Sequence, residues 1–473
     1  MSPAIQAILI IAAIVLGTIA FALYSVRHFK MEPQEFIVGG RSFGSVLLWI
    51  LLAGEIYTSF TFLGAAGYAY QRGAPSYYIL AYGTVGYVIA YFYLPRVWKI
   101  GKERGLMTWP DFLIDRYGSK TLGIGVALLQ FFLAVPYITL QLSGLRTILS
   151  IAGYNMLNTT VEVSIAFLLI ALFVFTAGIR GTAWASVVKD TLVLGAVLFA
   201  GVYLPLHFFG SSGAMFARVA QVHPHWLWLH PGDAPFGVNW YVTTVTLTAI
   251  GFFMGPANAQ AVFSAKSEDA VRRNMIYMPL YQIVVIFVLL AGFTALIVTP
   301  GLKGSQGDQS FLLLLQKYFP PFVVGLVGAA GCLAGLLPAS ALLMGAASIF
   351  SRNVAGNTRF VRPMVLVCAV LALILWLFLS SNLVDLLLFY YNGITQLAPG
   401  MILAVYWRRV SAWAVGAGIV TGELIALYFL EFLKSTSGPY GINPGLIALA
   451  ANVAVLLLIT WVAPRRQPEA ALT

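Results

Sequence analysis

Apolar residues run along this chain in continuous stretches of about 20 residues, without alternation between apolar and polar positions. Only helices and closed barrels satisfy all backbone polar groups inside a bilayer, and continuous apolar runs are typical of helices. The pattern predicts a single all-α integral membrane domain over 1–473 with thirteen transmembrane helices. Their expected ranges are 5–26, 45–70, 76–97, 121–149, 160–179, 184–207, 238–263, 276–299, 321–350, 363–380, 382–406, 411–432 and 441–463.

Composition supports this interpretation. Hydrophobic residues make up 60% of the chain and charged residues 9%, whereas about 25% of the residues in soluble domains are charged. The first apolar stretch has no basic segment before it and is longer than a signal-peptide core, so we expect an uncleaved helix at 5–26. The two cysteines, Cys332 and Cys368, lie in apolar stretches and indicate neither a disulfide nor a metal site.

The basic residues are unevenly divided between the two sides of the predicted bundle. One set of alternate loops and ends holds 21 of the 27 Lys and Arg residues. Cytoplasmic loops are enriched in these residues, so the pattern predicts an N-terminus outside and a C-terminus in the cytoplasm. Topology thereby accounts for most of the net charge of +11, and no nucleic-acid partner is expected. The other set consists of Arg72, Arg146, Arg218, Lys303, Lys317 and Lys434.

The predicted spans contain a repeat. Without the N-terminal helix 5–26 and the two C-terminal helices of 411–463, ten spans remain, which divide into 45–207 and 238–406. The two sets begin on opposite sides of the membrane, as in the inverted repeats of many secondary transporters. In such proteins the binding sites lie at the bilayer midplane, where helices are broken.

The leading span of each half carries residues that break helices. The first contains Gly54, Gly64 and Gly67, and the second contains Gly251, Gly255 and Pro256. Glycine tolerates unwound backbone, and proline removes a backbone donor. Close helix packing is the alternative explanation, because both residues are common in membrane helices. Their matching positions in the two halves favour a binding site.

Four segments occur in an order and spacing that resemble the sodium/solute symporter family: "PQEFIVGGRSFG", "GLMTWPDFLIDRYGSK", "GIRGTAWASVVKD" and "YWRRVS". The resemblance implies a LeuT-type fold of five plus five inverted spans. The segments "GEIYTSFTFLGAAGYAYQRGAP", "QAVFSAKSEDAVRRN" and "LAGLLPASALLMGAASIFSRN" are most similar to the bacterial monocarboxylate permease branch. That branch implies a symporter for lactate, pyruvate or related acids in the bacterial inner membrane.

The chain departs from the family where sodium-coupled members carry two hydroxyl residues opposite the broken second span. Its stretch "GLLPASALL" offers Leu336 and Leu337, or Pro338 and Ala339, with Ser340 the only hydroxyl nearby. Sodium is a hard cation that prefers several oxygen ligands. We therefore expect coupling to protons rather than sodium. In the alternative, Ser340 and backbone oxygens near Gly54 and Tyr57 rebuild a sodium site.

Two acids are candidates for ion coupling. Glu55 lies in the apolar second span, and an ionisable residue at membrane depth indicates function by default. Asp190 matches the aspartate of the family motif at the start of the sixth span. Alternatively, Glu55 pairs with a basic residue or hydroxyl groups, and Asp190 pairs with Lys189 or Arg180 at the cytoplasmic surface. Asp385 and Glu423 are expected to have structural roles.

Binding of a monocarboxylate requires hydrogen-bond donors or a positive helix end for its anionic group, and an apolar wall for its tail. No arginine is expected at the midplane, so affinity should be modest. A packing face remains the alternative for the candidates on the fourth span. The candidate substrate residues are Tyr57, Thr58, Asn258 and Gln260 at the breaks, Tyr137 and Gln141 on the fourth span, and Tyr391, Asn392 and Gln396 on the eleventh.

Other classes of protein fit less well. The sequence has no Walker loop, no HExxH motif and no nucleophile elbow, so we expect neither an enzyme nor a bound cofactor or metal. A channel would need a pore-lining ring of charges or carbonyls, and a sensor would need more than the short tail "APRRQPEAALT". The predicted partners are a small carboxylate and the lipid bilayer, without an obligatory protein partner. A sodium-coupled symporter for an amino acid, proline or pantothenate is the alternative function.

Overall fold

The computed structural model describes residues 1–29, 32–232, 234–378, 383–432 and 437–462, which are almost entirely helical. In these segments the only β-type contact is an isolated bridge between Phe43 and Ala265. The first part of the chain forms α1 (Pro3–Val26), α2 (Pro33–Val38), α3 (Ser45–Ile56), α4 (Ala65–Arg72), α5 (Tyr78–Glu103), α6 (Trp109–Tyr117), α7 (Lys120–Ala152), α8 (Thr159–Leu198), α9 (Leu204–Phe209) and α10 (Ser212–Val222). The remainder forms α11 (Val238–Gly251), α12 (Pro256–Ser264), α13 (Glu268–Gln282), α14 (Ile286–Val298), α15 (Ser310–Tyr318), α16 (Pro321–Ile349), α17 (Val361–Phe378), α18 (Leu383–Ile394), α19 (Ala398–Tyr406), α20 (Ala412–Leu427) and α21 (Pro444–Val462).

The all-helical membrane architecture agrees with the prediction, but the number of spans is only partly matched. Ten described helical segments are long and apolar enough to cross a membrane, or eleven with the bent pair α3 and α4. The expected spans 160–179 and 184–207 both fall in one helical segment, Thr159–Phe209, which begins with α8 and ends with α9. Within α8, Gly178 leaves helical geometry with φ 58° and ψ −173°. The expected span 238–263 is divided between α11 and α12. The count of thirteen therefore stays a prediction.

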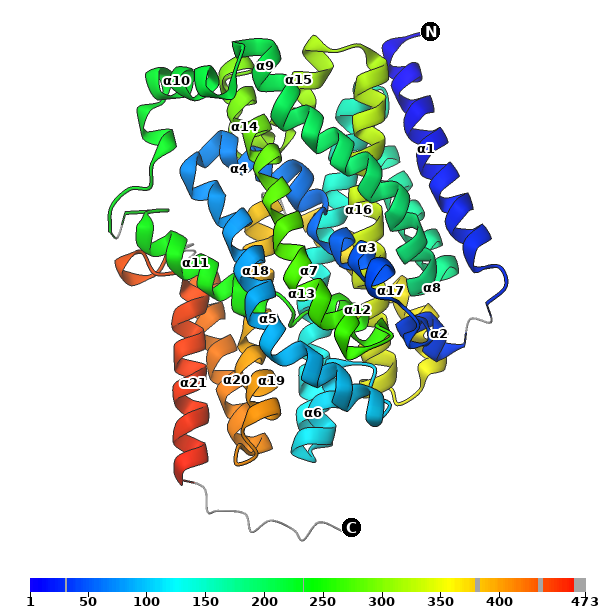
Figure 1. Ribbon diagram of the computed structural model, residues 1–473, viewed down its shortest axis with the longest axis vertical. Helices are drawn as coiled ribbons and strands as arrows, with labels where there is room; N and C mark the ends of the chain where they lie inside the picture. Colours follow the sequence, from blue (N-terminus) through cyan, green and yellow to red (C-terminus); the bar gives the residue numbers. More distant parts are fainter. Residues whose placement is uncertain (30–31, 233, 379–382, 433–436, 463–473) are drawn as a thin grey trace.

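The two ends of the helical bundle differ in their chain connections and charge. Helix α1 begins at the end of the molecule opposite to the end of α21 (Figure 1). We call these the N-terminal end and the C-terminal end. Several basic residues gather at the C-terminal end, where Arg352 forms an ion pair with Asp111 at 2.7 Å and Arg104 with Asp115 at 2.8 Å.

Helix α16 lies at the centre of the bundle and packs against α1, α7, α8 and α12. Small residues on this helix allow close approach of its neighbours. A Cβ atom on Gly328 would lie 2.9 Å from that of Ala152 in α7, and one on Gly335 would lie 2.6 Å from the hydroxyl oxygen of Ser59. This packing brings α16 directly against the break that follows α3.

The two broken helices meet in the middle of the bundle. The axes of α3 and the segment Phe60–Arg72 differ by 52°, and residues 252–255 separate α11 from α12. Helix α12 contacts both α3 and α16. The sequence pattern that predicted two interrupted helices thus corresponds to two adjacent breaks.

Candidate substrate and ion site

The break after α3 releases backbone carbonyls. Helix α3 ends at Ile56, and Tyr57 leaves helical geometry with φ −91° and ψ 86°. The amide of Thr58 donates to the carbonyl of Ile56 at 3.2 Å rather than continuing the helical pattern to Gly54. The Gly54 carbonyl therefore loses its helical partner at the negative end of the helix dipole, where a cation is favoured.

Lys189 of α8 occupies this position. Its ammonium nitrogen lies 2.8 Å from the Gly54 carbonyl, 3.4 Å from the Tyr57 carbonyl and 2.9 Å from the carboxylate of Asp190. The Lys189 side chain is 0% exposed and that of Asp190 is 9% exposed. Both Asp190 oxygens lack a well-directed hydrogen bond, so the contact is an ion pair. The sequence suggested a Lys189–Asp190 pair at the cytoplasmic surface; the structure buries that pair beside the helix break.

The amide side of the same break is bound by α7. The Ser59 amide donates to the side-chain oxygen of Gln141 at 3.0 Å, and the Thr61 hydroxyl donates to the Ile56 carbonyl. Gln141, a predicted substrate residue, thus caps the half-helix that follows the break. Its Nε2 has no hydrogen-bond partner among the described residues.

The break between α11 and α12 has its carbonyls occupied by side chains. The carbonyls of residues 252, 253 and 254 accept hydrogen bonds from Asn258, Trp109 and Gln130 respectively, the last two at 2.9 Å and 2.7 Å. Helix α12 then begins at Pro256, with its N-terminal end toward the middle of the bundle. This break supplies a positive helix end rather than free carbonyls.

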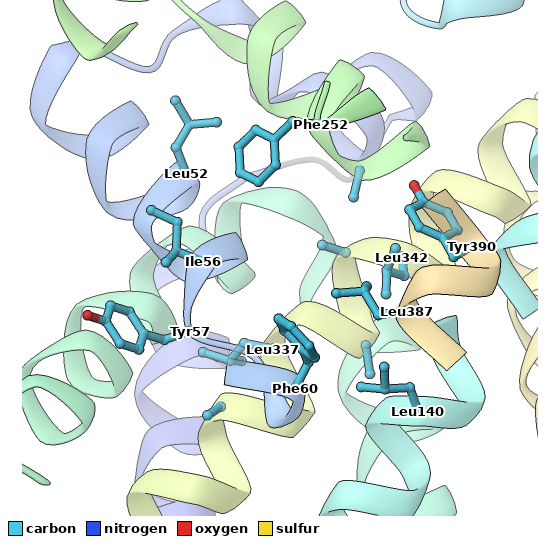
Figure 2. Close-up of a cluster of buried hydrophobic side chains, with 14 of the residues drawn as sticks. Leu52, Ile56, Tyr57, Phe60, Leu140, Phe252, Leu337, Leu342, Leu387 and Tyr390 are labelled. Atoms are coloured by element: carbon cyan, nitrogen blue, oxygen red, sulfur yellow. The ribbon is translucent and has the colours of Figure 1, made fainter. Parts of the chain in front are cut away.

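A small cavity lies between the two breaks. It is lined by Glu55, Tyr137, Phe252, Gly255, Ala257, Asn258, Leu342, Tyr390 and Tyr391. Its volume of about 20 Å³ has room for roughly one water molecule. Figure 2 shows three of these side chains, Phe252, Leu342 and Tyr390, converging from separate segments, while Tyr57 lies at the opposite edge of the cluster. None of the residues that line this cavity is basic.

The structure brings together only some of the predicted site residues. Glu55, Tyr137, Asn258 and Tyr391 line the cavity, and Gly54 and Tyr57 lie at the first break. The other candidates lie outside the cavity lining. Gln260 donates to Ser348 at 3.2 Å, Gln396 donates to the Gly445 carbonyl at 3.1 Å, Asn392 packs against Gly445, and Thr58 is buried at the first break.

Tyr390 and Lys189 are the polar residues at these two positions that the sequence analysis missed, and the apolar lining residues Phe252, Ala257 and Leu342 were not predicted either. Tyr390 lines the cavity beside the predicted Tyr391, and its ring lies 4.9 Å from that of Tyr137. Lys189 was considered only as a surface partner of Asp190. Lys189 could have been noticed in the sequence because it is a charged residue directly next to Asp190, a candidate for ion coupling.

The residues near the first break do not fit the sodium ion that the family resemblance implies. Ser340 donates its hydroxyl to the Leu336 carbonyl of its own helix at 2.7 Å, and Leu337 is a buried apolar side chain in the cluster of Figure 2. Lys189 already binds the carbonyls of Gly54 and Tyr57. Among the described residues, no group of three or more His, Cys, Asp or Glu side chains could hold a metal.

A second, wider cavity of about 450 Å³ opens at the N-terminal end. We call it the vestibule; Arg72 and Lys303 give its lining positive charge, and His223 is also part of the lining. Trp226 closes one side by donating its indole N–H to the Tyr70 carbonyl at 3.1 Å. The described residues that line the vestibule include no carboxylate.

Known proteins resemble this chain over nearly its whole length. The "Uncharacterized symporter YhjB" of Bacillus subtilis is 37% identical, with 98% of this chain and 99% of that protein covered. The "Monocarboxylate transport permease protein" of Rhizobium johnstonii is 29% identical over 92% of this chain and 91% of its own length. A solved Na+-coupled sialic acid symporter superposes with a TM-score of 0.78 at 16% identity, covering 98% of this chain and 99% of the other, which shows a shared fold. Residues 36–422 match the family described as the Sodium:solute symporter family. With this match over most of its length, the chain belongs to the sodium:solute symporter family of secondary transporters.

Proposed function

We propose that this transporter imports a small monocarboxylate, such as lactate or pyruvate, together with a proton rather than sodium. The relative from Rhizobium johnstonii, named as a monocarboxylate transport permease, supports the substrate class. The cavity between the breaks supports it as well. Its tyrosine hydroxyls and the N-terminal end of α12 offer hydrogen-bond donors, and Phe252 and Leu342 offer an apolar wall.

The position of Glu55 is the observation that supports coupling to a proton. Its carboxyl lines the cavity without a described hydrogen bond or ion pair and without a basic residue in the same lining. Two carboxylates in contact inside a buried site cannot both be ionised, so they share one proton. A monocarboxylate is larger than the single water molecule for which this closed cavity has room, so the cavity must open to admit it. The pair of carboxylates then requires a proton, which Glu55 supplies.

An amino acid or another zwitterion is the second candidate substrate. The ammonium group of a zwitterion would pair with an ionised Glu55, which lines the cavity. The "Sodium/proline symporter" of Haemophilus influenzae is 22% identical over 96% of this chain. Glu55 therefore distinguishes the two substrate classes by its charge.

The test is uptake of labelled lactate, pyruvate or proline into proteoliposomes, with a proton gradient and a sodium gradient imposed separately. We expect the proton gradient alone to drive monocarboxylate uptake. Glu55→Gln mimics the neutral acid, so it should retain lactate exchange within about threefold while losing the pH dependence of uptake. Sodium-driven uptake would contradict the proposal, and so would lactate uptake by Glu55→Gln with the pH dependence of the wild type. Proline uptake by the wild type that is lost in Glu55→Gln would favour the zwitterion instead.

We also propose that the C-terminal end is cytoplasmic and the N-terminal end faces outward in the bacterial inner membrane. The excess of basic residues on the predicted inner loops supports this orientation. Helices α3–α9 and α11–α19 then form the two inverted halves, with one break in the leading helix of each. Alternating access would expose the cavity first at the vestibule and then at the C-terminal end.

A further inference from the structure

A group of oxygen atoms surrounds the Lys189 ammonium, and the proposed function does not yet explain it. Two carbonyls and one carboxylate oxygen lie 2.8–3.4 Å from this nitrogen. The hydroxyl-bearing Ser186 precedes Lys189 by one helical turn, and a Cβ on Gly54 would lie 3.1 Å from the Ser186 oxygen and 3.3 Å from the ammonium. Oxygen atoms of these kinds are the ligands that hard monovalent cations prefer.

The burial of the Lys189–Asp190 ion pair is not explained by a contribution to protein stability alone. Removing an ammonium and a carboxylate from water costs several kcal/mol for each ion, and a well-packed apolar pair is often equally stable. Here the Lys189 side chain has no exposed surface. The arrangement therefore tolerates an unfavourable desolvation free energy, and its result is one positive charge at the broken end of α3.

We propose that Lys189 is a built-in cation, which fills a monovalent-cation site at the break of α3 from within the chain. The ammonium replaces an ion from solution and neutralises both the released carbonyls and Asp190. A second cation cannot enter the same group of ligands, because two unit charges about 3 Å apart repel strongly away from water. This inference deepens the proposed function, since it explains how the transporter works without sodium.

The inference predicts a latent ion site once the side chain is shortened. Lys189→Ala leaves the carbonyls and Asp190 in place and opens space for a small cation. We expect sodium or methylammonium at 100 mM to raise the Tm of the purified Ala variant by about 1–3 °C relative to bulky N-methylglucamine, with no such response in the wild type. In the Ala variant, the exchange rate with either of these cations should be at least about fivefold higher than the rate in N-methylglucamine.

Two further variants separate charge from space filling. Lys189→Met fills the space without a charge, so it should lose stability and exchange and gain nothing from added cations. Lys189→Arg keeps the charge and should remain nearer to the wild type in Tm. The exposed Lys99→Met provides the same chemical change at the surface and should match the wild type.

The test uses full-length protein in detergent for Tm and in proteoliposomes for exchange. Cation-dependent stabilisation of Lys189→Ala, absent from the wild type and Lys189→Met, is the expected result. A folded Ala variant that does not respond to sodium or methylammonium would overturn the inference, as would wild-type Tm and exchange in Lys189→Met. If the Ala variant does not fold, equal Tm values for the Arg and Met variants would overturn it. The Tm measurement needs no solute, so failure of the proposed substrate leaves this test intact.

Discussion

At the residue scale, the chemistry of the cavity depends on tyrosine. The rings of Tyr137 and Tyr390 lie 4.9 Å apart, and a Cβ on Gly255 would clash with the Tyr390 hydroxyl. That hydroxyl therefore reaches the start of α12, where a bound carboxylate would meet the positive helix end. Glycine at 255 is needed for this approach.

Removing the Tyr390 hydroxyl should weaken solute binding. A hydrogen bond to a charged group contributes about 1.5–3 kcal/mol, so Tyr390→Phe should raise the KM for lactate by roughly tenfold or more. Tyr277, which is 56% exposed and does not line the cavity, supplies the matched control Tyr277→Phe. Uptake kinetics at fixed pH give the measurement, and an unchanged KM in Tyr390→Phe would remove this residue from the solute site.

The residues of the site were predictable from sequence only where the signal was local. Glu55 stands out because a carboxyl interrupts an apolar span. Glycine and proline mark the second break, which Gly255 and Pro256 border. The first break was expected at glycines, but it falls at Tyr57, in a stretch without glycine or proline. Lys189 could not be assigned because its function depends on which distant carbonyls the break releases, and these belong to α3. Gln396 has a polar side chain at helical spacing, but it binds α21 through the Gly445 carbonyl.

At the element scale, the short helix η7 (Gly304–Gln309) ties two helices together at the N-terminal end. Its Asp308 accepts a hydrogen bond from the Leu383 amide at the start of α18 at 3.0 Å. On the other side, Gly67 of α4 packs so closely on Asp308 that a Cβ there would clash with it. Asp308 is 5% exposed, so the tie is buried.

Burial of this carboxyl should make the folded protein less stable as pH rises. Burial, with a further contribution from Asp385, raises the pKa of Asp308 from its ordinary value near 4 to about 7, although the Leu383 amide lowers it. The folded protein therefore holds a proton that the unfolded chain releases, and stability falls as pH increases from about 4 to about 7. The loss is at most roughly 3 kcal/mol between pH 5 and pH 7.

Asp308→Asn keeps the side-chain shape and cannot titrate. We expect the Tm of the wild type, relative to this variant, to decrease between pH 5 and pH 8. Exposed Asp269→Asn should follow the wild type across the same range. A constant difference in Tm between wild type and Asp308→Asn at the two pH values would contradict this account of the tie.

Sequence patterns identified most of the membrane helices but not all their limits. Apolar runs define α1, α16 and α21 because each crosses the bundle without interruption. The boundary inside α8 depends on the φ angle of a single residue, Gly178, which hydropathy cannot show. The division into inverted halves remains a prediction that rests on span order.

At the scale of the whole molecule, positive charge at the vestibule suits the anionic solute that we propose. The vestibule at the N-terminal end is lined by Arg72, Lys303 and His223. Arg72 is held over the ring of Phe236, with its guanidinium carbon 4.1 Å from the ring centroid. A concave surface with one sign of charge raises the local concentration of ions of opposite sign.

Neutralising this charge should affect the capture of solute from dilute solution. We expect the double substitution Arg72→Gln and Lys303→Gln to raise the KM for lactate by about threefold to tenfold at low ionic strength. The difference should largely disappear near 1 M salt, where the Debye length is about 3 Å. Uptake by cells that express each variant gives the measurement.

Lys317→Gln is the matched control, because Lys317 follows the same loop region without lining the vestibule. Its KM should equal that of the wild type at both salt concentrations. An effect of the double substitution that is independent of salt would show that shape or folding, rather than charge, is responsible.

The covalent attachment of Lys189 to α8 has a consequence for the surroundings in which this transporter can work. A tethered group acts at an effective concentration on the order of millimolar or above, and dilution of the medium does not change that value. A carrier with an ion bound from solution loses occupancy when the medium is depleted of that ion. With its positive charge fixed 2.8 Å from the Gly54 carbonyl, this protein would keep the cation position at the break of α3 equally occupied in fresh water and in brine.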